Sequence, residues 1–274
     1  AVINNFGGFY RTWVYVHEAW RYGAKIEPPC VNKSTYKTTI YGRDIYLGFI
    51  HIMNLEDKLA RSIEEIRNEG GPFSDLNDFV ERVCPGLEQV ILLIRTGAFR
   101  FTGKLKAVLL WEAHMMMNGK KHESIRPLFS QPVRSFSLPE LASGSLDDAY
   151  DEIELIGFPV SMSWFDMLET SFRGEIMARE LINNIGKRVR MVGHLVTIKY
   201  IKTVKREWMN FGCFIDAEGN FFDTTHFSQS LKYYPFKGSG TYLILGKVVE
   251  EFGFASLEVE KLAKLPVRPD KRYG

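Results

Sequence analysis

Apolar and polar residues alternate along the last third of this 274-residue chain. Val189, Met191 and Leu195 recur at even spacing, with Arg190 and His194 between them. Successive side chains of a β-strand point to opposite faces of a sheet, so this alternation predicts a half-buried strand that begins near residue 188. A basic loop, Lys199–Trp208, is expected after it.

Similar runs follow, separated by turn residues such as Asp216-Ala217-Glu218-Gly219. We predict strands over Trp208–Ile215, Phe221–Thr225, Thr241–Val249 and Phe254–Val259, and a short helix over Phe227–Tyr234. The order strand, strand, strand, helix, strand, strand is that of a small five-stranded Greek-key barrel of the OB type. Such barrels commonly bind single-stranded nucleic acid.

Upstream of residue 184 the apolar spacing is helical. Leu55, Leu59, Ile63 and Ile66 fall on one face of a helix predicted over 55–69, and Gly70-Gly71-Pro72 ends it. Ser74 is the candidate N-cap of the next helix. Further helices are predicted over 10–23, 87–95, 105–117, 143–156, 162–172 and 175–183, and a short hairpin over 40–45. The fold class is therefore multidomain α+β, with a helical region followed by the barrel.

Composition excludes several classes of protein. The three cysteines, Cys30, Cys84 and Cys213, form no CxxC pair, so neither a disulfide framework nor a zinc knuckle is expected, and a reducing cytoplasm fits best. No apolar run approaches the ~20 residues that span a bilayer. We expect no cofactor. The start at Ala1 without a methionine suggests an excised piece of a longer protein.

The net charge of +2 is too small to indicate nucleic acid, but charge is unevenly distributed. Residues 54–82 hold eight acids and four bases, whereas 95–121 hold six bases and one acid. Residues 138–160 hold six acids and no base, and 199–206 hold four bases and no acid. We expect Asp147, Asp148, Asp151 and Glu152 to lie on a solvated helix without a basic partner. Two separate basic patches favour a protein that follows phosphates.

Several short segments, in this order, point to a known family. They are Asn5-Phe6-Gly7-Gly8-Phe9-Tyr10, 24–34 (AKIEPPCVNKS), Gly71-Pro72-Phe73, Ile94-Arg95-Thr96-Gly97-Ala98-Phe99 and 154–161 (ELIGFPVS). Together they resemble the C-terminal half of the bacterial DNA polymerase III alpha subunit, a family C polymerase.

The resemblance implies an organisation along the whole chain. Residues 1–50 correspond to the end of the fingers, and 51–118 to tandem helix-hairpin-helix motifs. Residues 119–183 form a linker with a clamp-motif-like segment and connecting helices, 184–266 the OB barrel, and 267–274 a tail. The family's catalytic carboxylates lie in a palm domain that precedes this region. We therefore expect no catalytic residue, metal or enzyme activity in this chain, and a parent polypeptide that is a DNA-directed DNA polymerase.

The resemblance also implies DNA-binding residues. At the first hairpin Asn54 and Glu56 replace the family's usual glycines, so that hairpin is expected to be structural. The second hairpin keeps its glycine and its charge. Our predicted duplex-binding residues are Arg95, Gly97, Arg100, Lys104 and Lys106.

Two further sites complete the prediction. Leu128 and Phe129 match the end of a segment that docks into the sliding clamp in this family, although Ile125 stands where glutamine is usual. The predicted single-strand-binding residues are Lys199, Tyr200, Lys202, Lys205, Arg206 and Trp208. Phe211 and Phe214 are expected in the core, because their spacing suggests a bulged inward face, and His194 and His226 are expected to be ordinary structural histidines.

The partners we predict are duplex and single-stranded DNA, the sliding clamp and other replisome subunits, with no membrane. Two other functions stay open. The barrel could belong to an RNA-binding OB protein, or the chain could be a scaffold that binds only proteins.

Overall fold

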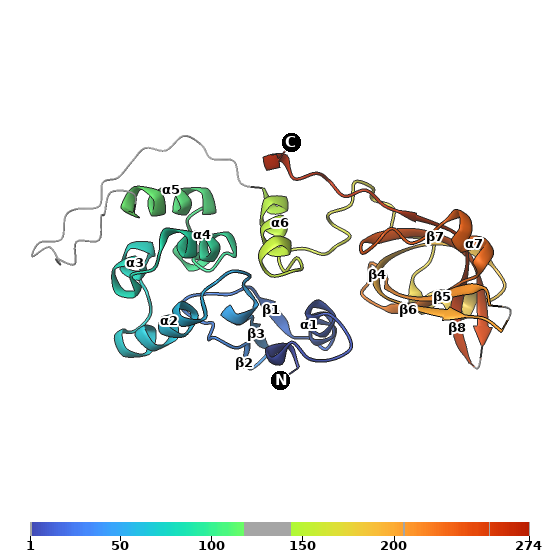
Figure 1. The fold of residues 1–274 in the computed structure, drawn as a ribbon, viewed down its shortest axis with the longest axis horizontal. Helices are drawn as coiled ribbons and strands as arrows, with labels where there is room; N and C mark the ends of the chain where they lie inside the picture. Colours follow the sequence, from blue (N-terminus) through green and yellow to red (C-terminus); the bar gives the residue numbers. More distant parts are fainter. Residues whose placement is uncertain (1, 118–143, 205, 252, 274) are drawn as a thin grey trace, which may run out of the picture. The chain divides into compact units, whose positions relative to one another are not determined.

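The computed structural model describes residues 2–117, 144–204, 206–251 and 253–273 (Figure 1). The chain divides into two compact units. The helical unit comprises Ala1–Gly7 and Tyr22–Ser161, and the barrel unit comprises Gly8–Arg21 and Met162–Gly274. Each unit is therefore built from two separate segments of the chain.

The helical unit opens with a small sheet in the order β1-β3-β2. Strands β2 and β3 form the predicted hairpin, with Gly42 at a positive φ of 64° in its turn. The parallel pairing of β1 with β3 was not predicted. The elements are η1 (Ile3–Asn5), β1 (Lys25–Glu27), β2 (Thr39–Tyr41), β3 (Asp44–Tyr46), η2 (Phe49–His51), α2 (Asp57–Gly70), α3 (Leu76–Val83), α4 (Leu87–Arg95), η3 (Arg100–Thr102), α5 (Lys106–Met117) and α6 (Ser145–Leu155).

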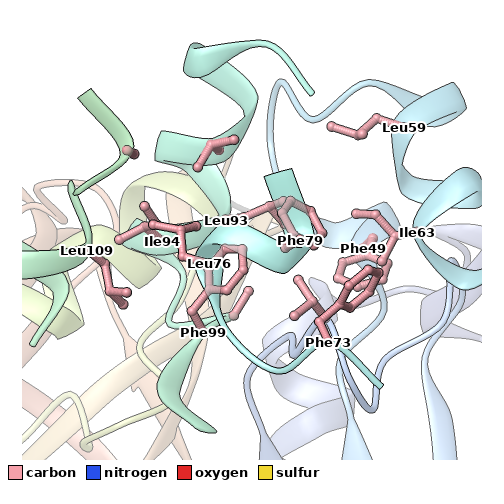
Figure 2. Close-up of a cluster of buried hydrophobic side chains, with 14 of the residues drawn as sticks. Phe49, Leu59, Ile63, Phe73, Leu76, Phe79, Leu93, Ile94, Phe99 and Leu109 are labelled. Carbon is pink, nitrogen blue, oxygen red and sulfur yellow. The ribbon is translucent and has the colours of Figure 1, made fainter. Parts of the chain in front are cut away.

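The core of the helical unit joins α2, α3, α4 and α5 (Figure 2). Phe79 lies at its centre, with its ring edge-on to Phe73 and to Phe99 at centroid distances of 5.0 Å. Ile63 of α2 is fully buried, as its amphipathic pattern predicts. These contacts tie the two helical pairs into one body.

One cap prediction is wrong. Helix α3 has Asp75, not Ser74, as its N-cap, because the Asp75 carboxylate accepts a 2.9 Å hydrogen bond from the amide of Asp78. The amide of Ser74 instead donates to the Asp78 carboxylate. Asp and Ser have similar preferences for the N-cap position, so their identity alone does not show which of two adjacent residues caps the helix.

The barrel unit contains the predicted closed barrel. Its strands follow the order β4-β5-β6-β8-β7, and β7 pairs again with β4. Strands β6 and β8 are parallel, whereas the other neighbours are antiparallel. The elements are α1 (Thr12–Arg21), η4 (Ala178–Asn184), β4 (Arg188–Lys202), β5 (Trp208–Ile215), β6 (Phe221–His226), α7 (Ser228–Tyr233), β7 (Thr241–Glu251), β8 (Phe254–Lys264) and η5 (Lys271–Tyr273). The predicted OB-type order, with a helix after the third strand, is confirmed.

Helix α1 packs on this barrel although it lies near the start of the chain. The Trp13 ring meets the edge of His194 at 5.4 Å and of Trp164 at 6.4 Å. Trp164 itself stacks on His194 at 4.4 Å. The helix predicted over Met162–Phe172 is therefore wrong: this segment forms turns that bring Trp164 onto the barrel wall.

Candidate nucleic-acid interface

Strands β4 and β5 continue beyond the barrel as a two-stranded arm, which we define as residues 198–202 and 208–211. The sequence placed Lys199, Tyr200 and Lys202 in a loop, but β4 runs to Lys202 before the chain turns. A bulge near Leu195–Thr197 adds one residue and so changes which positions face inward. Beyond it, Ile198, Tyr200 and Lys202 continue the alternation on one face. Backbone pairing therefore fixes these side chains in a defined array.

The register of the arm sorts its side chains into two faces. Cross-strand partners lie on the same face of the arm. Ile198 packs on the barrel core, and the pairs Tyr200–Asn210 and Lys202–Trp208 lie on the same face as Ile198. We call this side the inner face. The exposed fractions are 62% for Tyr200 and 55% for Trp208, and the Lys202 ammonium lies 4.6 Å from the Trp208 ring centroid. This face combines stacking surface with positive charge.

The outer face carries Lys199 and its partner Phe211, which is followed on β6 by Thr225. Phe211 is 38% exposed, so the prediction that it lies in the core is wrong. Asn210, Gly212 and Phe214 point inward at a spacing of two, and Phe214 is fully buried as predicted. The predicted single-strand set therefore does not share one face, and sequence reasoning missed Phe211.

The turn of the arm brings further charge. Arg206 has a left-handed backbone with φ of 61°, and its amide donates to the Thr203 carbonyl at 2.8 Å. Within the described ranges, no carboxylate lies within ion-pair distance of Lys199, Lys202 or Arg206. Lys205 lies outside the described residues. The charges of the arm are thus not neutralised by the described part of the chain.

The second helix-hairpin-helix differs sharply from the arm. The Arg95 guanidinium donates to Asp151 at 2.9 and 2.7 Å and also binds Glu154. The Lys106 ammonium lies 2.7 Å from Asp148 and donates to the Arg95 carbonyl. Hydrogen bonds from Arg95 to Glu154 and then to Asp151 raise the pKa of Arg95. Helix α6 therefore covers two basic residues of this hairpin, Arg95 and Lys106, with carboxylates.

The expectation that the acids of α6 lack basic partners is wrong. Asp151 is 4% exposed and Glu152 is 3% exposed. Glu152 accepts hydrogen bonds from the amides of Val160 and Ser161, which fix the turn after α6. The partners come from α4 and α5, about fifty residues earlier, so local sequence could not reveal them.

The other predicted duplex-binding residues also have internal partners. Arg100 pairs with Glu27 at 3.0 Å and donates to the Pro29 carbonyl, and Lys104 pairs with Glu112. Gly97 has a φ of 76°, which explains why glycine is needed there, and its amide donates to the Ile94 carbonyl. Duplex binding by this set stays a prediction.

The first hairpin also uses its amides internally. The Met53 amide donates to the Leu155 carbonyl, and the Glu56 amide donates to the Gln89 side chain. Asn54 adopts a φ of 63°, which asparagine tolerates. These contacts agree with a structural hairpin.

The barrel histidines are buried and neutral. Burial, followed by the nearby charges of Lys264, Arg11 and His17, lowers the pKa of His194 to about 3. Burial alone lowers the pKa of His226 to about 4. His194 shares a 3.0 Å hydrogen bond with Thr241, whereas one nitrogen of His226 has no partner among the residues that the structure describes.

Three remaining observations concern the described residues alone. Among them, no cluster of three or more histidine, cysteine or acidic side chains could hold a metal ion. None of their helices is long and apolar enough to cross a membrane. Leu128 and Phe129, the predicted clamp-binding pair, lie outside the described residues.

The fold defines a protein that joins a helix-hairpin-helix region to an OB-type barrel. Residues 23–109 match the family model described as "Helix-hairpin-helix motif". The chain is 31% identical over 119 residues to the DNA polymerase III subunit alpha of Thermus aquaticus, covering 39% of this chain and 10% of that protein. The DNA polymerase III subunit alpha of Aquifex aeolicus is 27% identical over 210 residues, which cover 74% of this chain and 17% of that protein. The Error-prone DNA polymerase of Mycobacterium bovis is 32% identical over 115 residues, covering 41% and 10%.

These matches confirm the resemblance that the motifs predict: the chain is similar to the C-terminal region of the bacterial DNA polymerase III alpha subunit family. It spans only a tenth to a sixth of these relatives. Among solved structures, the second OB-fold domain of replication protein A from Methanococcus maripaludis aligns with a TM-score of 0.24 and 8% identity over 31% of this chain and 91% of that one. The barrel assignment rests on its own strand order.

Proposed function

We propose that this chain is a DNA-binding C-terminal part of a bacterial DNA polymerase alpha subunit, and that its arm binds the single-stranded template. The observation that carries the proposal is the arm itself. It exposes Tyr200 and Trp208 on one face and Phe211 on the other, beside lysines without ion pairs in the described structure.

The energetics of the arm suit a single strand. Stacking a base on an aromatic side chain contributes about 1–3 kcal/mol and tolerates any sequence. Lys202, already close to the Trp208 ring, can keep that contact while it neutralises a phosphate. Backbone pairing holds the two strands of the arm in register before binding, which lowers the ordering cost.

Duplex contact through the second hairpin is the smaller part of the proposal. Every basic side chain there already has an acidic partner, so a phosphate must compete with a carboxylate. The arm is therefore expected to supply most of the affinity of this chain for primed DNA. For the longer polypeptide we propose DNA polymerase activity in the cytoplasm, with the clamp and other replisome subunits as partners. Nucleotide incorporation by this chain alone should be undetectable.

A salt series tests the arm. Binding of a labelled oligonucleotide is measured by fluorescence anisotropy between about 50 and 200 mM salt. The variant Lys202→Glu/Lys205→Glu/Arg206→Glu should weaken binding and reduce the slope of log K against log salt by about 0.7 for each lost phosphate contact. Lys187→Glu, just before the opposite end of β4, is the charge-matched control for the single variant Lys202→Glu and should leave the slope unchanged. An unchanged slope in the triple variant would refute the assignment.

A further inference from the structure

Two buried polar atoms below the arm lack a hydrogen-bond partner within the described structure. They are Oδ1 of Asn210 and Nδ1 of His226. The two residues are direct cross-strand partners on β5 and β6, and both point inward. Asn210 is 6% exposed and His226 is 0% exposed. Such orphaned atoms are rare, because each costs about 1–3 kcal/mol when buried unpaired.

The hydrogen bonds around Thr224 fix the tautomer of His226. The Thr224 hydroxyl donates its one proton to the Gly212 carbonyl at 3.0 Å. Nε2 of His226 lies 2.9 Å from the same hydroxyl oxygen, so Nε2 carries the proton and donates to it. Because burial lowers the pKa of His226 to about 4, the ring is neutral near pH 7 and Nδ1 is a bare acceptor.

The orphaned atoms are therefore two acceptors on facing strands. Two acceptors cannot satisfy each other, and a group that carries two hydrogens is the simplest complement to both. We call these two acceptor atoms the floor of the inner face. The floor favours a ligand group that donates hydrogen bonds.

The rim of this floor is aromatic. Tyr200 is the cross-strand partner of Asn210 on its other side, and Trp208 is two residues from Asn210 on the same face. The half-buried Phe236 lies against the His226 ring at a centroid distance of 4.6 Å. Tyr200 is largely exposed, so its side chain can swing aside without loss of core packing.

We propose that the inner face binds one base of the single strand by its exocyclic amine, with Asn210 and His226 as the acceptors that select it. This inference rests on the proposed function and adds a base preference to it. Stacking on the rim is blind to sequence, whereas the floor distinguishes bases by their edges.

The selection follows from the edges of the bases. Cytosine, adenine and guanine each carry an amino group with two hydrogens, whereas thymine has two carbonyl oxygens and a single N3–H. That one proton can satisfy only one of the two acceptors, and the other then faces a carbonyl oxygen. Thymine should therefore be disfavoured.

A matched pair of ligands provides the test. Oligonucleotides of 5-methyl-deoxycytidine and of thymidine have the same ring size and the same methyl group, and they differ in the exocyclic amine, the carbonyl and the N3 proton. The full chain should bind the 5-methyl-deoxycytidine oligonucleotide about tenfold more tightly in anisotropy titrations. This comparison needs no protein variant.

Variants then identify the residues. Asn210→Leu and His226→Phe keep approximate size and remove one acceptor each, so the ratio of the two affinities should fall toward one while thymidine binding persists. The melting temperature of Asn210→Leu should hold or rise, because an unpaired polar group is lost, whereas His226→Phe also loses the hydrogen bond from Nε2 to Thr224 and should melt lower. Equal wild-type affinities for the two ligands, both salt-dependent, would overturn the inference and leave the proposed function standing. Failure of both oligonucleotides to bind at low salt would overturn the proposed function itself.

Discussion

The ion pair between Arg95 and Asp151 should be a main determinant of stability in the helical unit. The perturbation is Asp151→Asn, which keeps the side-chain shape and removes its charge. The Asp151 side chain is 6% exposed and the Arg95 side chain 20% exposed, so solvent cannot replace the lost partner. Arg95 keeps Glu154, whose side chain is 52% exposed.

The magnitude follows from this burial. Removing one partner of a buried pair costs about 3–5 kcal/mol, and the surviving Glu154 contact places Asp151→Asn near 3 kcal/mol. The control is Glu154→Gln, which removes a half-exposed partner of the same arginine and should cost about 0–1 kcal/mol. The two variants differ by a factor of roughly thirty or more in the opening equilibrium.

Hydrogen exchange measured by mass spectrometry reads out this difference locally. In Asp151→Asn, amides of α4 should lose about a hundredfold in protection, whereas amides of β5 in the barrel unit should be unchanged. The barrel peptides are an internal control in the same sample. Equal losses of α4 protection in Asp151→Asn and Glu154→Gln would refute the reasoning from burial.

Three further predictions concern the barrel unit. Gly246→Ala places a methyl group against the Glu258 carbonyl, well inside contact distance, and should lower the unfolding free energy by about 1–3 kcal/mol in urea titrations. Trp13→Ala removes the ring that packs on His194 and should cost about 3–5 kcal/mol in the same titration, without changing α4 protection. His194 and His226 have folded pKa values of about 3 and about 4, below 6.5 in the unfolded chain, so the unfolded state binds more protons in acid. The stability of the barrel unit should therefore fall as pH drops from 6.5 toward 4, by about 1.4 kcal/mol per pH unit for each of these two histidines, and His226→Phe should reduce the slope of the barrel transition by half.

The barrel could be predicted because its information is local. Alternation within each strand and turn residues between strands are patterns of neighbouring residues. Both can be recognised in a short window of sequence without knowledge of tertiary contacts. The same holds for α2, whose apolar face is buried as expected. The end of β4 was missed because a bulge shifted the alternation, so its last residues were assigned to a loop.

The candidate site was less predictable because charge and burial there depend on distant residues. Arg95 and Lys106 form a basic patch in the sequence, but the fold brings α6 against them. Asn210 was overlooked because a polar residue in a strand usually faces solvent, yet its spacing from Phe214 indicates an inward position. Phe211 was wrongly assigned to the core because the inward positions, Asn210 and Phe214, were not recognised as one alternating set that leaves Phe211 on the other face.

The packing of α1 on the barrel has a consequence for synthesis of the chain. Trp13 meets His194, which follows it by about 180 residues, and translation adds about 5–20 residues per second. The apolar face of α1 therefore stays without the barrel it packs on for roughly ten to forty seconds, while the ribosome synthesises the helical unit. During that interval the nascent chain carries an unsatisfied hydrophobic segment, which a ribosome-associated chaperone could shield. Removal of residues 1–21 would take this cover from the finished barrel and expose the rings of Trp164 and His194 that Trp13 contacts.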